Sequence, residues 1–339
     1  RCGLCVQMVA PLLRIGTDVN HYQTQREPLC HFVPPAPGID FSGSVSPAAT
    51  DRTAARRYCG CDRVVAIGRS GASGGVGLFD ASGVTVTPLP PVASPAGALM
   101  PTGGGARDVA LGGAFGEQAW VTSDDGQLSV FDVSPGASRE VDIVDGDPAN
   151  GTQRITLGVE PRGIAMLHDR PFALVATETD IVVLNTETGT MTGIFPAGSL
   201  GFPAGTRPLD IVVTHDDAAA FVSAYSLDPQ SPSKTVVILA LDATALSTGV
   251  GTLSGSTVNL IGPCNPQQLA LSHDGKWVAV TCPKSNEVAL LDATTGALAD
   301  IDPNSEPFNA QFSAPPLFQP SGIPSALAWA DDDSGVYVG

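Results

Sequence analysis

Residues 266–296 read PQQLALSHDGKWVAVTCPKSNEVALLDATTG, and this stretch decides the fold. An apolar segment after Pro266 leads to a His-Asp-Gly turn, a second β-rich segment at 277–281 and, after a polar loop, a third at 288–291. Stretches of about four to six apolar residues between turn residues are typical of strands and are too short for helices. The stretch therefore predicts three antiparallel strands, and a weaker fourth strand follows them.

The same pattern recurs along the chain. Related segments begin near residues 63, 106, 161, 208, 266 and 324. Two clear copies are ARDVALGGAFGEQAWVTSDDGQLSVFDVSPG from Ala106 and PRGIAMLHDRPFALVATETDIVVLNTETG from Pro161. Four antiparallel strands repeated at roughly 40–60 residues indicate a β-propeller in which each repeat is one blade. The predicted fold is therefore an all-β propeller of stacked four-stranded blades over residues 61–339, because a single blade cannot bury both of its faces.

The strand count predicts an incomplete last blade. The segment from Arg63 supplies the second to fourth strands of a blade, four full blades follow, and the segment from Pro324 supplies two strands that end at Gly339. We expect six or seven blades in the complete ring. We also expect that the natural chain continues beyond Gly339, or that another chain completes the ring.

These repeats resemble the YVTN-type bacterial β-propeller repeats, whose relatives include lactonase-like seven-bladed propellers. The resemblance rests on Pro-x-x-Ile/Leu-Ala, His-Asp-Gly, Val-Ala-Val and Leu-Leu-Asp-x-x-Thr-Gly, and it covers about residues 63–339. It implies the fold but does not select an activity, since this repeat serves enzymes and binding modules alike.

Composition excludes several classes of function. The 339 residues include 34 acids and 17 bases, for a net charge of −17, which repels nucleic acid and anionic lipid. The apolar content of 43% argues against disorder, and no apolar run approaches the roughly 20 residues of a membrane helix. The sequence starts at Arg1, so we expect that an upstream segment was removed or is missing. Attachment to the cell envelope would then use an associated protein or that missing anchor.

Residues 1–60 do not match the repeat and predict a Cys-rich, Pro-rich, irregular N-terminal extension. Five of the seven cysteines lie within 61 residues of the start. The seven are Cys2, Cys5, Cys30, Cys59, Cys61, Cys264 and Cys282. A redox dithiol, a zinc half-site or a haem attachment at Cys2 and Cys5 is one interpretation, but the second cysteine pair of a zinc site and the His of a haem motif are missing. We favour disulfides, with Cys264 and Cys282 as a local bridge across one hairpin, and hence an oxidising compartment outside the cytoplasm.

We interpret the recurring His and Asp residues first as turn-forming residues, and only second as catalytic or metal-binding residues. His168, His215 and His273 occupy the same place in successive repeats, and we expect them to help close the turn between the first two strands. Equivalent places in a ring should lie too far apart to share one ion. A second set ends the third strand of each repeat, where Asp and Asn side chains bond nearby backbone groups. This set is Asp80, Asp132, Asn185, Asp242 and Asp292.

The start of each first strand holds the candidate ligand-binding residues, because propeller ligands usually lie at that mouth of the central channel. The candidates are Arg107, Glu160, Arg162, Arg207, Asp210, Asn265 and Gln267. Three arginines in consecutive blades suit a carboxylate or phosphate, since the guanidinium is a fork-shaped donor. The alternative is that they form ion pairs between blades.

One further loop has oxygen ligands for a cation. Asp145, Asp147 and Asn150 lie in DIVDGDPANG, where the spacing departs from the EF-hand, so we favour a solvated turn and keep a Ca²⁺ site as the alternative. No other cofactor is expected.

Three functions remain open. We favour an exported or cell-envelope bacterial propeller, periplasmic, associated with the outer membrane or secreted, that binds other protein subunits as a scaffold. The alternatives are a lactonase-like hydrolase or small-molecule-binding propeller that uses the channel mouth, and a redox propeller that uses Cys2 and Cys5. The sequence does not name the partner or the ligand.

Overall fold

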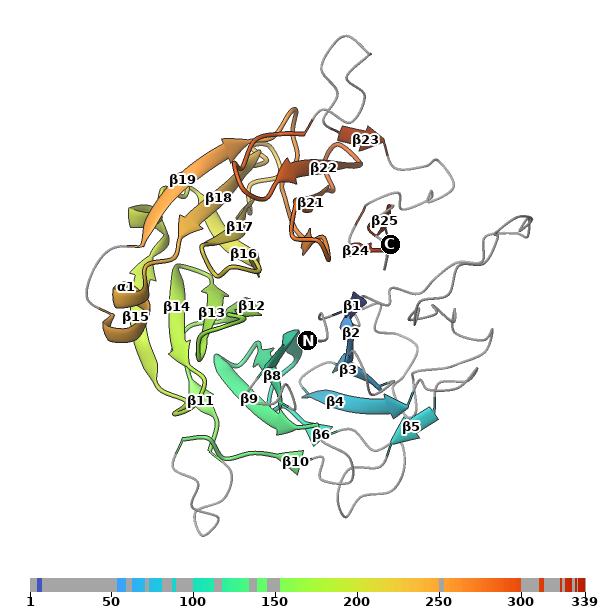
Figure 1. Cartoon of the computed structure of the whole chain (residues 1–339), viewed down its shortest axis with the longest axis vertical. Helices are drawn as coiled ribbons and strands as arrows, with labels where there is room; N and C mark the ends of the chain where they lie inside the picture. The colour runs from blue at the N-terminus through green and yellow to red at the C-terminus, as the bar shows by residue number, and fades with distance from the viewer. Residues whose placement is uncertain are drawn as a thin grey trace, which may run out of the picture.

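A computed structural model of the chain describes most of the repeat region and short segments of the N-terminal part. The described residues are 5–7, 54–58, 63–70, 73–80, 87–89, 100–112, 118–133, 139–144, 153–249, 253–299, 311–313, 324, 327–330, 333 and 335–338. Their strands form six antiparallel sheets, which we call sheets A to F in chain order. In Figure 1 the sheets are arranged around a common centre, each with its first strand innermost.

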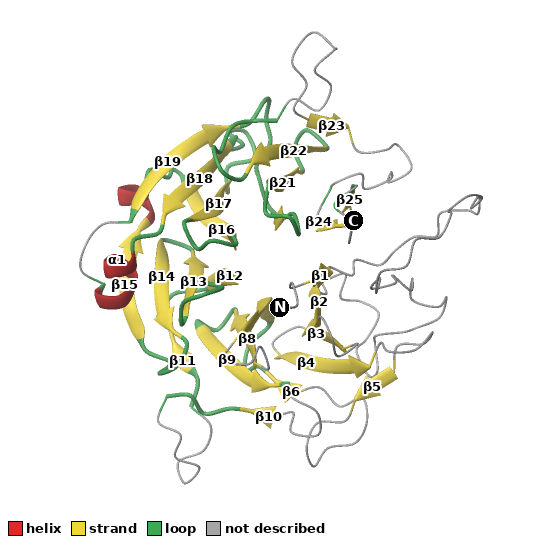
Figure 2. Cartoon of the chain, in the orientation of Figure 1, coloured by secondary structure: helices red, strands yellow, loops and turns green. Residues whose placement is uncertain are grey.

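The described residues are mostly in strands, and the two short helices among them lie at the outer edge of sheets C and D (Figure 2). Sheet A consists of β1 (Cys5–Gln7), β2 (Ala54–Tyr58), β3 (Arg63–Ser70), β4 (Ser73–Asp80), β5 (Thr87–Leu89) and β6 (Met100–Pro101). Sheet B consists of β7 (Ala106–Gly112), β8 (Gln118–Ser123), β9 (Gln127–Asp132), β10 (Arg139–Glu140) and β11 (Ile155–Thr156). Sheet C consists of β12 (Pro161–Met166), β13 (Phe172–Thr177), β14 (Asp180–Asn185) and β15 (Met191–Pro196).

The remaining sheets follow the same plan. Sheet D consists of β16 (Thr206–Val213), β17 (Ala219–Ser226), β18 (Thr235–Ala240) and β19 (Ser254–Asn259). Sheet E consists of β20 (Leu269–Leu271), β21 (Trp277–Cys282), β22 (Glu287–Asp292) and β23 (Gln311–Ser313), and sheet F of β24 (Leu327–Trp329) and β25 (Val336–Val338). The helices are η2 (Ala197–Leu200) and α1 (Ala243–Thr248). The prediction of an all-β propeller with four-stranded blades is confirmed, whereas the total number of blades stays a prediction.

The hydrophobic core lies between sheets rather than within one. One buried cluster joins sheets C and D through side chains such as Leu174 and Val222, and similar clusters fill the other spaces from sheet A to sheet F. All six residues of β13 are buried, because both faces of this strand pack against a neighbouring sheet. The outermost strand β19 is almost entirely exposed and accordingly reads SGSTVN. Burial thus differs between the middle strands and the outermost strand of a sheet, which explains why the middle strands read as continuous apolar runs.

Two segments of the predicted N-terminal extension belong to sheet A. Strand β2 pairs with β3, and β1 pairs with β2, so both lie on the inner side of that sheet. The predicted boundary at residue 60 therefore cuts through sheet A. The innermost strands β1 and β24 lie side by side, which makes sheets A and F neighbours (Figure 1). Whether residues 1–60 form a separate unit stays a prediction.

The bridge between Cys264 and Cys282 is present, as predicted. Cys264 lies just before β20 and Cys282 ends β21, and both side chains are buried. The bond therefore ties the entry of the inner strand of sheet E to its second strand. Cys2, Cys30, Cys59 and Cys61 lie outside the described residues, and Cys5 begins β1.

Candidate functional site

Carboxylates join the innermost strands of neighbouring sheets. Asp108 in β7 accepts a hydrogen bond from the backbone N–H of Ile164 in β12 at 2.9 Å. Asp210 in β16 accepts one from Leu269 in β20 at 2.7 Å. Both aspartates are buried, and each also accepts from the backbone N–H of the residue that follows it. Asp210, a candidate ligand-binding residue, lies in the link between sheets D and E, and its ligand-binding role stays a prediction.

The sheets that lack this link are joined at the other end of the inner strands. Asp217 in sheet D accepts from the backbone N–H groups of His168 at 2.7 Å and Asp169 at 2.9 Å, in sheet C. In the same way, Asp333 accepts from His273 at 2.8 Å and Asp274 at 2.7 Å, which joins sheet F to sheet E. The links thus alternate: sheets B–C and D–E are joined at the start of the inner strand, and sheets C–D and E–F beyond its end.

Three predicted arginines come together at the starts of β7, β12 and β16. Arg107 pairs with Glu160, and Arg162 lies 3.3 Å from Glu160 and 2.9 Å from Glu178. Arg207 completes the chain, 2.6 Å from Glu178. We call these five residues the arginine cluster. Ion pairs between blades, the alternative to ligand binding, are therefore present for Arg107 and Arg207, whereas Arg162 pairs within sheet C. A ligand-binding role for the three arginines stays a prediction.

The arginine side chains of the arginine cluster are mostly buried. The three arginine side chains are only 13–20% exposed. Among the described residues, no hydrogen-bond partner is seen for the buried Nε atoms of Arg162 and Arg207. Burial lowers the pKa of Arg207, and the positive charge of Arg162 lowers it further, although an arginine stays charged in proteins. The cluster thus retains donor capacity on two of its guanidinium groups.

Glu178 was missed by the sequence analysis. It lies between β13 and β14, in the turn that joins the second and third strands of sheet C. Alternating antiparallel strands bring this turn to the same end as the start of the first strand, which is the signal that could have identified it.

Asn265 and Gln267 play supporting roles. Asn265 is buried, adopts a positive φ of 51°, and its amide oxygen accepts from the backbone N–H of Ser226 at 2.8 Å. Its amide nitrogen donates to the carbonyl oxygen of Ser226 at 3.1 Å. The carbonyl oxygen of Gln267 accepts from the hydroxyl of Ser223 at 3.0 Å. Neither residue belongs to the arginine cluster: Asn265 holds the loop after β17, and Gln267 adds to the link between sheets D and E.

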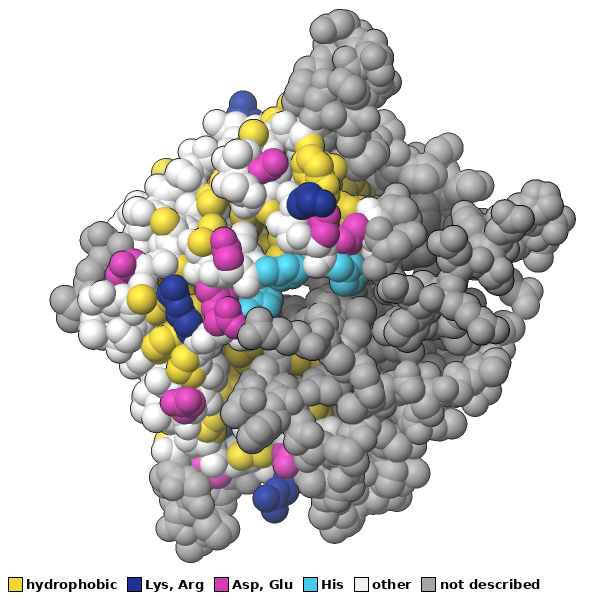
Figure 3. Space-filling model, viewed as in Figure 1, with side chains coloured by type: hydrophobic (Ala, Val, Ile, Leu, Met, Phe, Trp, Pro, Cys, Tyr) yellow, Lys and Arg dark blue, Asp and Glu magenta, His cyan; other side chains and the backbone are white. Residues whose placement is uncertain are grey.

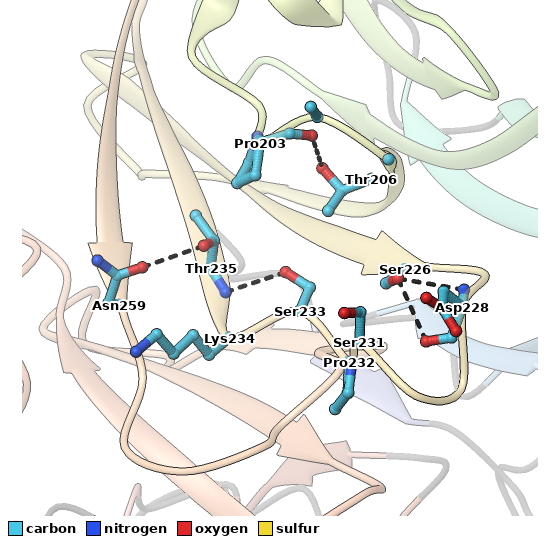
Figure 4. Close-up of a pocket in the computed structure, with 12 residues that line it drawn as sticks. Pro203, Thr206, Ser226, Asp228, Ser231, Pro232, Ser233, Lys234, Thr235 and Asn259 are labelled. Carbon is cyan, nitrogen blue, oxygen red and sulfur yellow. Dashed lines mark hydrogen bonds between the residues drawn. The ribbon is translucent and has the colours of Figure 1, made fainter.

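Two open cavities lie beside Arg207, the member of the arginine cluster that belongs to sheet D. One, of about 280 Å³, is lined by Arg207, Glu178 and Leu227 together with Thr179, Gly205 and Thr206. The other, of about 610 Å³, shares Gly205 and Thr206 with it. Figure 4 shows how Ser226, Ser233 and Thr235 line the larger cavity along with Lys234 and Asn259. Leu227 is 63% exposed, so the two cavities flank an exposed apolar side chain. We call this surface the sheet D groove.

The three histidines cluster at the opposite end of the inner strands. His168 follows the end of β12, and His215 follows the end of β16. Their rings lie edge to face with centroids 5.2 Å apart. The two rings are in contact, whereas the expectation that equivalent histidines lie too far apart to share one ion stays a prediction. Figure 3 shows the described histidines gathered beside a hollow at the centre of this face, with acidic side chains around them.

Carboxylates hold two of these imidazoles. Nδ1 of His168 lies 3.2 Å from Asp217, and Nδ1 of His273 lies 2.9 Å from Asp333. A carboxylate accepts, so we assign the proton to Nδ1 in both histidines. The prediction that these side chains close their own turns is wrong, because each binds the carboxylate of the next sheet. We call His168, His215 and His273 the histidine cluster.

His215 lacks the equivalent carboxylate because Gly275 occupies that place. Gly275 has a φ of 73°, and a Cβ atom there would lie 2.9 Å from Nδ1 of His215. Burial lowers the pKa of His215, and the nearby His168 and His273 lower it further. Both effects favour the neutral form of this imidazole.

The turn-forming role of the strand-ending residues is confirmed for three of them. Asn185 accepts from the backbone of Glu187 and Thr188. Asp292 accepts from Thr294 and Thr295, and Asp242 caps the N-terminus of α1.

In the DIVDGDPANG loop, Asp145, Asp147 and Asn150 lie outside the described residues. Metal binding by this loop therefore stays a prediction. Within the described ranges, no group of three or more His, Cys, Asp or Glu side chains is arranged to hold a metal ion. No described helix has the length and hydrophobicity of a membrane-spanning segment.

Comparisons with known proteins support the fold. No family model matches the sequence, and no curated protein matches it either. A solved structure described as a putative 6-phosphogluconolactonase from Bacteroides uniformis is 15% identical, with a TM-score of 0.50, over 76% of this chain and 69% of that one. A protein from Lactobacillus plantarum is 18% identical, with a TM-score of 0.45, over 71% and 81%. A dihydro-heme d1 dehydrogenase is 14% identical, with a TM-score of 0.43, over 70% and 43%. The chain thus shares its β-propeller fold with the lactonase-like protein.

Proposed function

We propose that this chain is an extracytoplasmic β-propeller, of the YVTN-type repeat group, that binds a protein partner as part of a larger assembly. The observation that carries the proposal is the sheet D groove, where cavities lined by both polar and apolar groups flank the exposed Leu227 beside the arginine cluster. An apolar side chain surrounded by polar and charged groups is the pattern of a protein interface core and its rim. The location outside the cytoplasm is supported by the Cys264–Cys282 bridge.

The arrangement of the arginine cluster favours binding over catalysis. Oε1 of Glu160 and Oε1 of Glu178 are each shared by two guanidinium groups. A general base needs a lone pair within reach of a substrate proton, and these oxygens already accept from arginine. The same pairs hold the first strands of three sheets in position, which suits a rigid binding surface.

The experiment compares two leucine-sized side chains on different surfaces. Leu227 in the groove is 63% exposed, and Ile194 on the outer strand β15 is 55% exposed. Proteins crosslinked to the wild type in an envelope extract would be identified by mass spectrometry and then purified. The affinity of these partners for the propeller should fall by at least about tenfold with Leu227→Asp and stay unchanged with Ile194→Asp. Equal affinity for all three proteins would refute the groove as the binding surface.

A lactonase-like hydrolase is the second candidate. It is favoured by one observation, the position of Arg207 in the wall of an open cavity, where a guanidinium suits the phosphate or carboxylate of a substrate. The solved propeller described as a putative 6-phosphogluconolactonase shows that this fold is found in proteins assigned that activity. Purified protein would be assayed with a panel of phosphorylated and unphosphorylated lactones. Turnover that is lost with Arg162→Met and with Glu160→Gln, but kept with Leu227→Asp, would favour the enzyme over the binding module.

A further inference from the structure

Lys234 brings a positive charge to the sheet D groove. It immediately precedes β18, its side chain is exposed, and it lines the larger cavity. In the part of the chain that the structure describes, no carboxylate forms an ion pair with its ammonium group. Figure 4 shows the side chain extended so that the ammonium nitrogen lies away from Asp228, the acidic residue of this cavity. The charge of Lys234 is thus available to a ligand.

The lining of the groove is far less acidic than the chain as a whole, whose net charge is −17. It holds two bases, Arg207 and Lys234, and two acids, Glu178 and Asp228. Glu178 is shared by Arg162 and Arg207, at 2.9 and 2.6 Å. An acidic ligand is therefore repelled less at this surface than the net charge of the chain implies. A carboxylate that pairs with Lys234 would come from that ligand.

Neutral hydrogen-bond donors lie in the same cavity as Lys234. The amide oxygen of Asn259 accepts from the hydroxyl of Thr235 at 3.1 Å, which leaves the amide N–H groups for a ligand. The hydroxyl oxygen of Ser233 accepts from the backbone N–H of Thr235 at 3.2 Å, so its own hydrogen can be donated. An ammonium group together with amide and hydroxyl donors suits a carboxylate, which accepts several hydrogen bonds.

The shape of the groove suits an extended segment. Its two cavities share Gly205 and Thr206, so they form one elongated surface. The exposed Leu227 lines the smaller cavity and Lys234 lines the larger one. An extended chain advances about 3.3 Å per residue, and so a few residues can place one side chain in each cavity. The two cavities therefore differ in chemistry: one offers an apolar contact, and the other offers a positive charge.

We propose that the groove binds an acidic, extended segment of its protein partner. A Glu or Asp carboxylate of this segment pairs with Lys234, and an apolar side chain packs on Leu227. The inference rests on the proposed function, because it names the part of the partner that enters the groove. Lys234 then determines specificity, since it separates an acidic segment from a neutral one of the same shape.

Fluorescence anisotropy on the whole chain tests the proposal with two defined probes. One is a short labelled peptide that alternates Leu and Glu, and the other has Gln in place of Glu. The wild type should bind the Glu peptide about five- to tenfold more tightly, as expected for hydrogen bonds to a charged group at a partly exposed site. Lys234→Met should remove this preference and Lys234→Arg should keep it. Salt at roughly molar concentration should reduce it, because the ion pair is exposed.

The matched control is Lys284→Met. Lys284 is exposed in the turn between β21 and β22 of sheet E, outside the groove, and its removal should leave the preference for the Glu peptide unchanged. The inference is overturned if neither peptide binds at roughly millimolar concentration, if the wild type binds both equally, or if Lys284→Met abolishes the preference as Lys234→Met does.

Leu227→Asp separates failure of this inference from failure of the proposed function. The variant should weaken binding of both peptides, including the uncharged Gln peptide. If it does so while the wild type shows no preference for Glu, the groove stays a binding surface and the acidic segment is refuted. If Leu227→Asp binds both peptides as the wild type does, the groove is not the docking surface, and the proposed function fails together with this inference.

Discussion

The carboxylate of Asp210 accepts a hydrogen bond from the backbone N–H of Leu269, 59 residues further along the chain, at 2.7 Å. This bond joins the innermost strands of two neighbouring sheets at a place where both residues are buried. It shows how the repeats are held to one another by main-chain and side-chain atoms in addition to apolar packing.

Removal of this carboxylate should destabilise the fold. Asp210→Ala leaves the backbone N–H groups of Ile211 and Leu269 buried without their acceptor, and we expect a loss of about 2–4 kcal/mol in the free energy of unfolding. Urea unfolding followed by tryptophan fluorescence measures it. Asp228→Ala, at an exposed aspartate of the same sheet, is the control and should change the free energy by less than about 0.5 kcal/mol. Similar losses in both variants would contradict the assigned role.

Gly163 should not tolerate a methyl group. A Cβ atom there would lie 2.8 Å from Cα of Asp210 and 2.9 Å from the carbonyl oxygen of Leu209, both backbone atoms of the neighbouring strand. We expect Gly163→Ala to cost about 1–3 kcal/mol, because β12 and β16 must move apart. Gly198→Ala is the matched control, since nothing lies within 4 Å of its Cβ position. Equal thermal unfolding midpoints for the two variants would show that the strands do not approach so closely.

The disulfide should contribute measurably to stability. Cys264 and Cys282 are separated by 18 residues, and a loop of this size corresponds to about 3 kcal/mol in the chain-entropy account. The double variant Cys264→Ala/Cys282→Ala should lose about that amount in urea unfolding. Dithiothreitol should lower the midpoint of the wild type more than that of the double variant. If the reductant lowers both midpoints equally, the effect comes from other cysteines.

Protonation of Asp274 should account for part of the stability that the fold loses in acid. A hydrogen bond from Lys276 is the largest cause that lowers the pKa of this carboxyl from 3.8 to about 2. Because the folded pKa lies below the unfolded one, the carboxylate stabilises the fold above pH 3.8, and this contribution is lost as the pH falls toward 2. Asp274→Asn should therefore make the unfolding midpoint less dependent on pH in this window. Lys276→Met, which keeps the carboxyl but removes its partner, should raise the pKa of Asp274 toward 3.8; NMR titration would show it, and an unchanged pKa would rule out the ion pair.

The fold could be predicted from sequence because each strand carries its own local signal. The segments predicted at 172–176 and 181–184 correspond to β13 and β14, whose buried faces produce the apolar runs. α1 was not expected, since the sequence indicates only a turn after Asp242. The turn residue became the N-cap of α1, an α-helical turn that the described residues of the other blades lack after their third strand.

The candidate sites were predictable only in part, because their contacts join residues far apart in sequence. The three arginines lie at or beside the start of the first strand in consecutive repeats, and this alone placed them together. Glu178 comes from a different turn of the repeat. Asp217 binds His168 of the neighbouring sheet, from which it is 49 residues away in sequence. Periodicity locates equivalent residues but does not say which neighbour from the next repeat meets them.

The alternation of the aspartate links has a consequence for symmetry. Asp108 and Asp210 serve one kind of junction, and Asp217 and Asp333 serve the other, so the smallest unit that repeats both junctions is a pair of blades. A closed ring accommodates such a two-blade period without a mismatch only if the number of blades is even. Of the two totals predicted from the sequence, six meets this parity condition and seven would force two junctions of one kind to be adjacent.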